Sequence, residues 1–464
     1  MAVAMEADAD LKRLIMGYSG PDQPDEDLLK QCVHCGMCLS ACPTYRITGQ
    51  EMSSPRGRLW MMRAVGEGTL DLLDPAFDEQ MYQCLNCRAC EAVCPSGVQY
   101  GVLVESARSQ LEQHRPRPVW QRAVRKAAVG WLFSKDVRLR TVVTTIGLYQ
   151  GSGVQAVMRR SGFLKRIRMA DLEAMLPRVS RRPLRPATER WAPATPEQSV
   201  ALFNTCMMGT VFADTNRAAG RVLAHNGCSV SLPAGQQCCG ALAVHAGMMG
   251  EARSLARTNI DAFGDGDEPI VVTAAGCGAA LKEYGHLLHD DPVYADRAVA
   301  FSTRVRDATE LLTELPEFQP PSQPVPLRVT YQEPCHLAHA QRISKQPRAL
   351  LAAIPELELA EMRESSLCCG SAGIYNILRP HMANDLGDRK AANAAATDAE
   401  VLVTANPGCA MQMVASLRRN GIEMEVRHII DVLDESYGGE AAGIPGQWAC
   451  DRAEAASSTG ETRP

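Results

Sequence analysis

The sequence has no apolar run long enough to cross a membrane, few aromatic residues and no recognisable export signal. Its best apolar candidate, residues 141–158, is interrupted by Gln150, Ser152 and Gln155, whereas a membrane-spanning helix needs about 20 mostly apolar residues. The first thirty residues carry acidic side chains early and no signal-peptide core. We therefore expect a cytoplasmic chain, in which closely spaced cysteines act as metal ligands or redox groups.

The sequence also lacks the motifs of an enzyme that oxidises its own substrate. No G-x-G-x-x-G fingerprint opens a helix, and no flavin-binding stretch is present. The histidines that could act as bases have no recognisable partner, so we expect them to be structural: His286, His336, His339 and His428. We predict no catalytic residue in this chain, and no nucleic-acid partner because no recognition motif accompanies its basic residues.

The sequence is long and rich in cysteine. Its 464 residues, 46% hydrophobic and 22% charged, are typical of a soluble globular chain of roughly three domains. Eight of its 18 cysteines lie between Cys32 and Cys94, and eight more form a repeated pattern that begins at Cys206 and ends at Cys409. Two stand outside both groups: we predict Cys228 to be a small core residue and Cys450 to be incidental.

The first group repeats one motif. The stretches QCVHCGMCLSACP and QCLNCRACEAVCP both contain C-x2-C-x2-C-x3-C-P, a spacing typical of 4Fe–4S clusters, and in two-cluster ferredoxins the last cysteine of each run binds the other cluster. Zinc is the alternative, but zinc motifs usually join two distant cysteine pairs. We therefore predict two 4Fe–4S clusters, one bound by Cys32, Cys35, Cys38 and Cys94, the other by Cys84, Cys87, Cys90 and Cys42.

The segment between the two runs is about forty residues long, which favours helices over a small β-type ferredoxin. Ser54-Pro55 predicts the start of a helix, and a second helix is expected over Pro75 to Tyr82. Some of the nearby arginines are expected to offset the negative charge of the clusters, the others being solvated: Arg56, Arg58, Arg63 and Arg88.

The second half of the chain is an internal duplication. Residues 199–206 and 327–335 each read as a buried strand ending in cysteine, as do 269–277 and 400–409, and Cys238-Cys239-Gly240 is answered by Cys368-Cys369-Gly370. Strands alternate with helical stretches such as 252–263 and 385–396, which predicts parallel sheets flanked by helices. Because ligands collect at the carboxyl edge of such sheets, the cysteines at these strand ends are a candidate site.

These eight cysteines resemble the CCG domain of the heterodisulfide reductase family: Cys206, Cys238, Cys239, Cys277, Cys335, Cys368, Cys369 and Cys409. In its fullest form that motif ends in C-x-x-C, but here Cys277 is followed by Gly-Ala-Ala and Cys409 by Ala-Met-Gln. The special noncubane cluster is therefore not expected. Three alternatives remain: a further conventional cluster, a site for a partner or quinone, or buried thiols.

The order of these parts is similar to that of the iron–sulfur subunits of bacterial glycolate oxidases. The similarity covers residues 30–435 and is carried by CVHCGMCLSACPTY, SSPRGRL, CLNCRACEAVCPSGVQY, AAGCGAALKEYGHLL, LCCGSAGIY and VTANPGC. The resemblance implies an electron-transfer subunit. FAD-containing subunits on other chains would oxidise glycolate to glyoxylate, and this chain would pass the electrons to quinone or another membrane acceptor.

The resemblance leaves related functions open. Similar chains serve L-lactate utilisation and anaerobic glycerol-3-phosphate oxidation. A heterodisulfide reductase-like catalyst at the CCG cysteines, or a scaffold stiffened by its clusters, are further alternatives.

We expect an α+β chain, with a helical two-cluster ferredoxin domain at residues 1–110 and a basic helical segment with a proline-rich linker at 111–196. CCG repeats follow at 197–325 and 326–437, then a disordered tail at 438–464. Residues 101–190 hold 19 Lys and Arg against six Asp and Glu, a net charge of +13. A solvated helical face explains such a bias most simply, but this region is also expected to dock on the flavin subunits or peripherally on the anionic inner face of the membrane.

Overall fold

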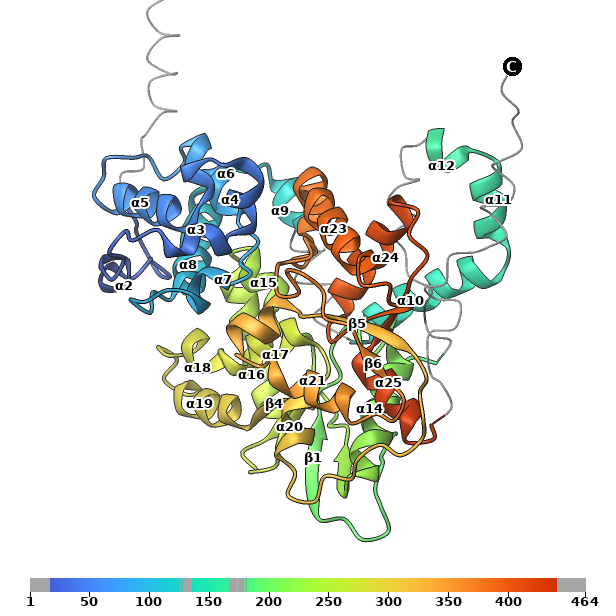
Figure 1. Cartoon of the computed structure of the whole chain (residues 1–464). Helices are drawn as coiled ribbons and strands as arrows, with labels where there is room; N and C mark the ends of the chain where they lie inside the picture. Colours follow the sequence, from blue (N-terminus) through green and yellow to red (C-terminus); the bar gives the residue numbers. More distant parts are fainter. Residues whose placement is uncertain are drawn as a thin grey trace, which may run out of the picture. The chain divides into compact units, whose positions relative to one another are not determined.

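The computed structural model describes residues 17–125, 127, 136–166, 173, 179 and 182–439, so that Cys450 and nearly all of the predicted tail lie outside the described residues. Contacts divide the chain into two units (Figure 1). One comprises Met1–Lys126 with Leu242–Ala252, and the other Ala127–Ala241 with Arg253–Pro464. The short segment Leu242–Ala252 therefore packs with the N-terminal unit although it belongs to the first repeat by sequence.

Within the described ranges, no helix combines the length and the apolar character that crossing a bilayer requires.

The N-terminal unit is helical, and its core forms around α8 (Tyr100–His114). Leu103, Val104, Ala107 and Leu111 of this helix are fully buried. The other helices of this part of the chain are α2 (Glu26–Lys30), α3 (Met37–Ala41), α4 (Pro43–Thr48), the 3-10 turn η1 (Glu51–Ser53), α5 (Pro55–Gly66), α6 (Pro75–Gln83), α7 (Ala89–Ala92) and α9 (Val119–Arg125).

The two helix starts predicted from proline are confirmed. Ser54 is the N-cap of α5, where its hydroxyl accepts a hydrogen bond from the N–H of Gly57 at 3.0 Å, and Asp74 caps α6 in the same way. Proline follows each cap, since its missing N–H costs nothing in the first turn. Gly57 is required by space, because a Cβ there would lie 2.1 Å from the carbonyl oxygen of Glu51.

The second unit contains two parallel four-stranded sheets with the same topology. The first has the order β2-β1-β3-β4 and the second β6-β5-β7-β8. The strands are β1 (Gln198–Leu202), β2 (Cys228–Ser231), β3 (Ile270–Val272), β4 (Val305–Asp307), β5 (Arg328–Gln332), β6 (Glu358–Leu359), β7 (Val401–Thr404) and β8 (Glu425–His428). The predicted duplication and parallel sheets are thereby confirmed.

Helices connect and flank these strands. The first repeat has α14 (Ala213–His225), α15 (Ala241–His245), α16 (Met249–Phe263), α17 (Ala275–Lys282), α18 (Tyr284–Leu287), α19 (Ala295–Arg304) and α20 (Ala308–Glu314). The second has the π-helix η3 (His336–Ala340), α21 (Lys345–Ala352), α22 (Tyr375–Leu378), α23 (Pro380–Ala395), α24 (Pro407–Arg419) and α25 (Ile429–Ser436). Before the first repeat lie α10 (Asp136–Gly151), α11 (Val154–Arg160) and α12 (Phe163–Arg166).

The two repeats pack through equivalent helices. In the first repeat α14 follows β1 and contacts α25, the last helix of the second repeat, while α21 follows β5 and contacts α20, the last helix of the first. Such reciprocal contacts are those of a two-fold related pair. One hydrophobic core joins both repeats, and Cys228 lies fully buried in it, as predicted.

A buried acid lies in this contact. Asp431 at the start of α25 is buried, and its Oδ2 accepts a hydrogen bond from the hydroxyl of Thr215 on α14 at 3.0 Å. Burial raises the pKa of Asp431 from 3.8 to about 8. Three residues later, Asp434 pairs with Arg221 of α14 at 2.6 Å.

We expect Asp431→Asn to stabilise the protein at neutral pH. Between pH 3.8 and about 8 the folded chain keeps the Asp431 proton and the unfolded chain loses it. The free energy of unfolding of the wild type should therefore fall by about 1.4 kcal/mol per pH unit from this group. In anaerobic unfolding experiments, the midpoint of Asp431→Asn should exceed that of the wild type by an amount that grows from pH 5 to pH 7.

Asp434→Asn is the control and should destabilise the protein, because it breaks the ion pair with Arg221. Equal midpoints for Asp431→Asn and wild type at every pH would contradict the raised pKa of Asp431.

Candidate iron–sulfur centres

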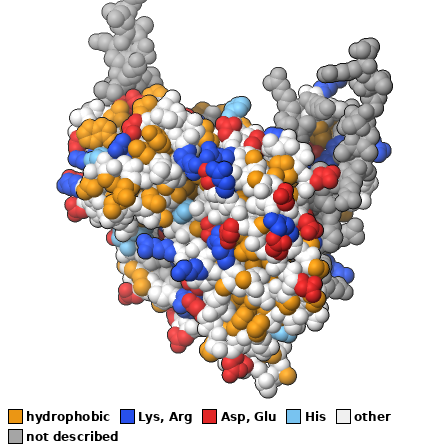
Figure 2. Space-filling model, viewed as in Figure 1, with side chains coloured by type: hydrophobic (Ala, Val, Ile, Leu, Met, Phe, Trp, Pro, Cys, Tyr) orange, Lys and Arg blue, Asp and Glu red, His pale blue; other side chains and the backbone are white. Residues whose placement is uncertain are grey.

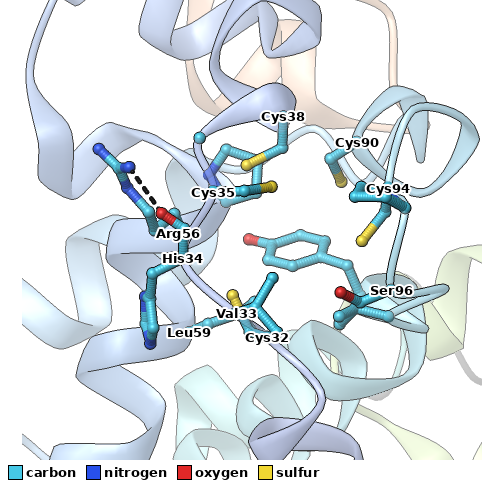
Figure 3. A pocket seen from close by; sticks show the side chains of 15 residues that line it. Cys32, Val33, His34, Cys35, Cys38, Arg56, Leu59, Cys90, Cys94 and Ser96 are labelled. Atoms are coloured by element: carbon cyan, nitrogen blue, oxygen red, sulfur yellow. Dashed lines mark hydrogen bonds between the residues drawn. The ribbon is translucent and has the colours of Figure 1, made fainter.

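Five cysteines of the N-terminal unit line one hollow of about 430 Å³, part of it open to solvent. Figure 3 shows the sulfur atoms of Cys32, Cys35, Cys38 and Cys94 around this space, with Cys90 beside Cys94. Arg56 lies at its edge and donates a hydrogen bond to the carbonyl oxygen of His34 at 3.1 Å. Cys35 is exposed, whereas the other three predicted ligands of this hollow are partly buried.

Four cysteines line a second hollow of about 290 Å³. They are Cys42, Cys84, Cys87 and Cys90, and all four are buried. Cys90, Tyr100 and Pro55 line both hollows and so form the wall between them.

The last cysteine of each run lies with the other run. Cys94 lines the hollow of the first run and Cys42 that of the second. The grouping of side chains is thus the one expected for two clusters that exchange their fourth ligand. That these thiolates bind clusters stays a prediction.

Both runs wrap their hollows with the same backbone conformation. His34 and Gly36 in the first run have positive φ of 54° and 85°, and the equivalent Asn86 and Arg88 in the second have 51° and 59°. Left-handed residues at these positions turn the chain sharply, so that three cysteines spaced by three can face one space. Arg88 accepts this conformation without being glycine, and Gly101 leaves room for it, since a Cβ there would lie 2.5 Å from its Nε.

The donor arrangement fits a group larger than one ion. Zinc holds its thiolates at about 2.3 Å and therefore draws their sulfurs together. In the part of the chain that the structure describes, no three His, Cys, Asp or Glu side chains converge in that way. Sulfur atoms spread around a hollow are what a cubane needs, with one thiolate for each of its four irons. The arrangement of the cysteines around the hollows therefore fits such a cluster.

A buried arginine lies at the second hollow. Arg58 of α5 is fully buried, donates to the carbonyl oxygen of Gln80 at 2.8 Å and to the hydroxyl of Thr44 at 3.1 Å, and lines this hollow beside Cys42 and Cys84. Burial alone would lower its pKa, but Tyr100, Cys84 and Cys42 raise it above its ordinary value. A cation that stays charged here would offset the negative charge of a thiolate-bound cluster.

The four arginines named from the sequence therefore differ. Arg58 and Arg88 are buried and line the second hollow, and Arg56 lines the first while pairing with Glu51 at 2.7 Å. Arg63 is partly exposed and lies over the ring of Trp60.

A network that sequence reasoning missed supports the second hollow. Glu105 of α8 is buried and accepts a hydrogen bond from Asn86 at 2.6 Å, with Arg88 at 3.7 Å and His245 at 3.4 Å. Burial by itself would raise the pKa of Glu105, but His245, Arg88 and Arg108 lower it to about 2. His245 belongs to the segment Leu242–Ala252, which begins three residues after Cys239. No sequence signal connects residues 105 and 245, since only the fold brings them together.

The CCG cysteines lie beyond the carboxyl ends of three adjacent strands in each sheet. In the first repeat Cys206 follows β1, the Cys238-Cys239 pair follows β2, and Cys277 lies in the first turn of α17 after β3. In the second, Cys335 and Cys368 follow β5 and β6, with their sulfurs 4.0 Å apart, and Cys369 and Cys409 complete the set. Within each repeat the four thiols lie close enough to shift one another's pKa.

The position of the missing last cysteine is filled differently in the two repeats. Ala280 occupies it in the first, within a hydrophobic cluster. Gln412 occupies it in the second, where it is buried and donates to the carbonyl oxygen of Ala383 at 3.0 Å. Neither residue can replace a thiolate ligand.

The two CCG sites also differ in charge. Lys390 is buried beside the second site and donates to the carbonyl oxygen of Ser365 at 2.8 Å. Hydrogen bonds from Cys368 and Cys409, and then the charge of Lys390, lower the pKa of Cys369. In the first repeat a neutral residue, Asn259, fills the corresponding region and donates to the carbonyl oxygen of Cys238 at 3.0 Å.

The four histidines that could act as bases have structural contacts. His428 is the N-cap of α25, with its Nε2 2.9 Å from the carbonyl oxygen of Thr273, and burial lowers its pKa to about 4. His339 contacts the carbonyl oxygen of Ser366, and His286 stacks on His289. His336 lies with its Nδ1 3.6 Å from the sulfur of Cys335.

Known families match each part of this arrangement. A 4Fe-4S dicluster domain matches residues 28–98, the cysteine-rich CCG domain matches 200–282 and 329–414, and the linker region of the glycolate oxidase iron–sulfur subunit matches 120–176. The probable glycolate oxidase iron–sulfur subunit of Bacillus subtilis (strain 168) is 42% identical over 90% of this chain and 96% of its own length. The chain belongs to the family of glycolate oxidase iron–sulfur subunits.

Other relatives extend the comparison. The glycolate oxidase iron–sulfur subunit of Escherichia coli (strain K12) is 33% identical over 89% of this chain and 95% of its own length. A lactate utilization protein A from Exiguobacterium is 31% identical over 51% of this chain and 97% of its own. The crystal structure of a hypothetical protein from Helicobacter pylori shares the fold, with a TM-score of 0.53 and 10% identity over 97% of this chain and 79% of that one.

We expect Arg58→Gln to lower the midpoint potential of the cluster predicted for the second hollow by on the order of 60 mV, a tenfold change in a one-electron equilibrium. The reason is that removing a buried positive charge disfavours adding an electron. A redox titration followed by electron paramagnetic resonance measures the shift. Arg63→Gln on the same helix is the matched control and should leave the potential nearly unchanged, and Arg58→Lys should restore part of it. An unshifted potential in Arg58→Gln protein with full iron content would contradict the assignment.

Proposed function

We propose that this chain is the electron-transfer subunit of a flavin-dependent glycolate oxidase complex. The observation that carries the proposal is that the eight cysteines of the two runs line two adjoining hollows, with Cys90 common to both. The names of the B. subtilis and E. coli relatives support glycolate as the substrate of the complex. FAD-containing partner chains would oxidise glycolate to glyoxylate, and two 4Fe–4S clusters in this chain would carry the electrons singly toward quinone or another membrane acceptor.

The proposed ligands of each cluster are those that the exchange of the fourth cysteine predicts, and the linings of the two hollows support them. We assign Cys32, Cys35, Cys38 and Cys94 to the first cluster, and Cys42, Cys84, Cys87 and Cys90 to the second. The backbone N–H of Asn86 and the hydroxyl of Tyr100 donate to the sulfur of Cys84 at 3.3 and 3.7 Å. Such hydrogen bonds to ligand sulfur are one way in which a protein sets cluster potential.

Paired cysteine variants test this exchange of ligands. Cys35→Ser should cost the chain one cluster, about four irons by the 4Fe–4S formula. Adding Cys94→Ser should remove little more iron, because both cysteines serve the same cluster. Adding Cys42→Ser instead should remove iron from both clusters. Iron and acid-labile sulfide are counted after anaerobic purification, and the reverse pattern would show that each run binds its own cluster.

The two hollows differ in their access to a partner. Cys35 is exposed, as are its neighbours in sequence Val33 and Met37, and Trp60 is exposed with its ring 6.2 Å from that of His34. All four cysteines of the second hollow are buried. Figure 2 shows hydrophobic side chains gathered over the N-terminal unit. Aromatic residues and methionine are enriched in protein interfaces. We place electron exchange with the flavin subunits at the first hollow for this reason.

The eight CCG cysteines are proposed to form a further redox site. Each repeat places four thiols at its sheet edge, and the buried Lys390 favours negative charge at the second site. A further cluster would raise the iron content above that of two cubanes, and Cys369→Ser would remove the excess. If iron stays at the value for two clusters, these cysteines are buried thiols or line a partner or quinone site.

The chain is proposed to act in the cytoplasm, peripherally on the inner face of the cell membrane, where a quinone acceptor would be reached. We also propose the domain boundaries expected from the sequence, except that residues 242–252 pack with the N-terminal unit. His245 and its neighbours, from the first repeat, pack beside the loop of Asn86 in the N-terminal unit. The segment Leu242–Ala252, which contains His245, begins three residues after Cys239 in the sequence.

Purification of the native complex tests the function as a whole. We expect flavin-containing chains to co-purify, and glycolate to bleach the iron–sulfur absorbance of this subunit under anaerobic conditions. L-Lactate and glycerol 3-phosphate are the comparison substrates, since the lactate utilization relative matches half of the chain. Faster reduction by one of these would assign the complex to that substrate, and clusters that no reductant or quinone can address would favour the scaffold alternative.

A further inference from the structure

The linker region between the N-terminal unit and the repeats contains three consecutive helices with an unusual surface. Figure 1 shows α10, α11 and α12 in succession within the second unit. Residues 136–166, which include all three, hold six Lys and Arg and a single acid, Asp136. The segment is therefore strongly basic, in a chain whose net charge is −5.

Helix α10 is attached to the second unit through one side only. Leu139 and Val143 are buried in a hydrophobic cluster with residues of both repeats. Val137 and Leu148 are eleven residues apart, which is about three helical turns, so both point to the opposite side. Their exposed fractions are 66% and 67%.

The same combination continues along the next two helices. Val154 and Val157 lie three residues apart on α11 and are exposed, as is Phe163 at the start of α12. Arg160 and Arg166 are exposed among them. Among the described residues after α12, the first acidic residue is Glu173. It is buried, and its carboxylate lies 3.0 Å from the guanidinium of Arg159.

We propose that the outward side of α10–α12 is a membrane-contact surface that binds an anionic lipid bilayer. The proposal rests on the proposed function, in which the electron acceptor lies in a membrane. Helices that lie in the interface of a bilayer combine exposed apolar side chains with Lys and Arg. Anionic headgroups complement the positive charge, and valine, leucine and phenylalanine enter the boundary of the acyl chains. Protein interfaces are enriched in aromatic residues, whereas the large exposed apolar side chains of these helices are valines, one leucine and one phenylalanine.

Binding to vesicles tests the surface without any enzyme assay. The full chain, purified anaerobically with its clusters, is sedimented with vesicles of phosphatidylcholine alone or mixed with phosphatidylglycerol. We expect binding at least about tenfold tighter to the anionic vesicles at low salt, weakening above about 0.15 M salt. Val137→Asp/Leu148→Asp should lose most of this binding, because two carboxylates would face the headgroups.

The chain offers a matched control elsewhere. Val293 and Val299, near and within α19, have exposed fractions of 66% and 54%, so Val293→Asp/Val299→Asp changes the net charge equally and should bind anionic vesicles like the wild type. Iron content and thermal unfolding show that both double variants are folded.

The outcomes separate this inference from the proposed function. Wild-type protein that ignores anionic vesicles, or a Val137→Asp/Leu148→Asp variant that binds them as well as the control, overturns the membrane surface and leaves the electron-transfer role intact. If that variant keeps its vesicle binding but no longer co-purifies with the flavin chains, the surface is a protein interface and the inference is wrong. Vesicle binding by a chain that carries no iron–sulfur clusters would leave the surface standing and remove the proposed function.

Discussion

The N-terminal unit depends on one geometric constraint: the last cysteine of each run must lie with the first three cysteines of the other. Cys42 and Cys94 both satisfy it, and the two hollows consequently share a wall formed by Cys90, Tyr100 and Pro55. Cysteines of both runs pack in one hydrophobic cluster with residues of the surrounding helices. Left-handed residues at equivalent positions of both loops turn the chain around each hollow.

Charge is distributed around the hollows according to depth. The buried second hollow has two buried arginines, Arg58 and Arg88, and the network of Glu105 and His245 holds its loop. The first hollow is nearer to solvent, and among the described residues that line it the arginine is Arg56, which is paired with Glu51. Since negative charge is costly to bury without a cation, the deeper centre needs more positive charge than the outer one. This difference supports the proposed roles of an outer centre that meets the partner and an inner one that continues the path.

The duplicated half shows how equal folds can acquire unequal sites. Both sheets have the same strand order and bring four thiols to the same edge. Yet Lys390 is buried beside the second site only, and the missing ligand position is Ala280 in one repeat and Gln412 in the other. The repeats also share a core and a reciprocal helix contact, so each stabilises the other. Divergence at the edges leaves that shared packing untouched.

The sequence by itself determined the features that depend on neighbouring residues. The starts of α5 and α6, the parallel sheets and the duplication were predicted correctly, because each follows from a local pattern or from a repeat. The grouping of the cysteines was expected from two-cluster ferredoxins, in which the last cysteine of each run binds the other cluster. Their role as cluster ligands stays a proposal. Only the tertiary structure decided which arginines are buried, that His245 and Glu105 meet, and that Val137 and Leu148 face outward while Leu139 and Val143 do not. Those properties depend on side chains brought together from distant positions, and no local pattern encodes such contacts.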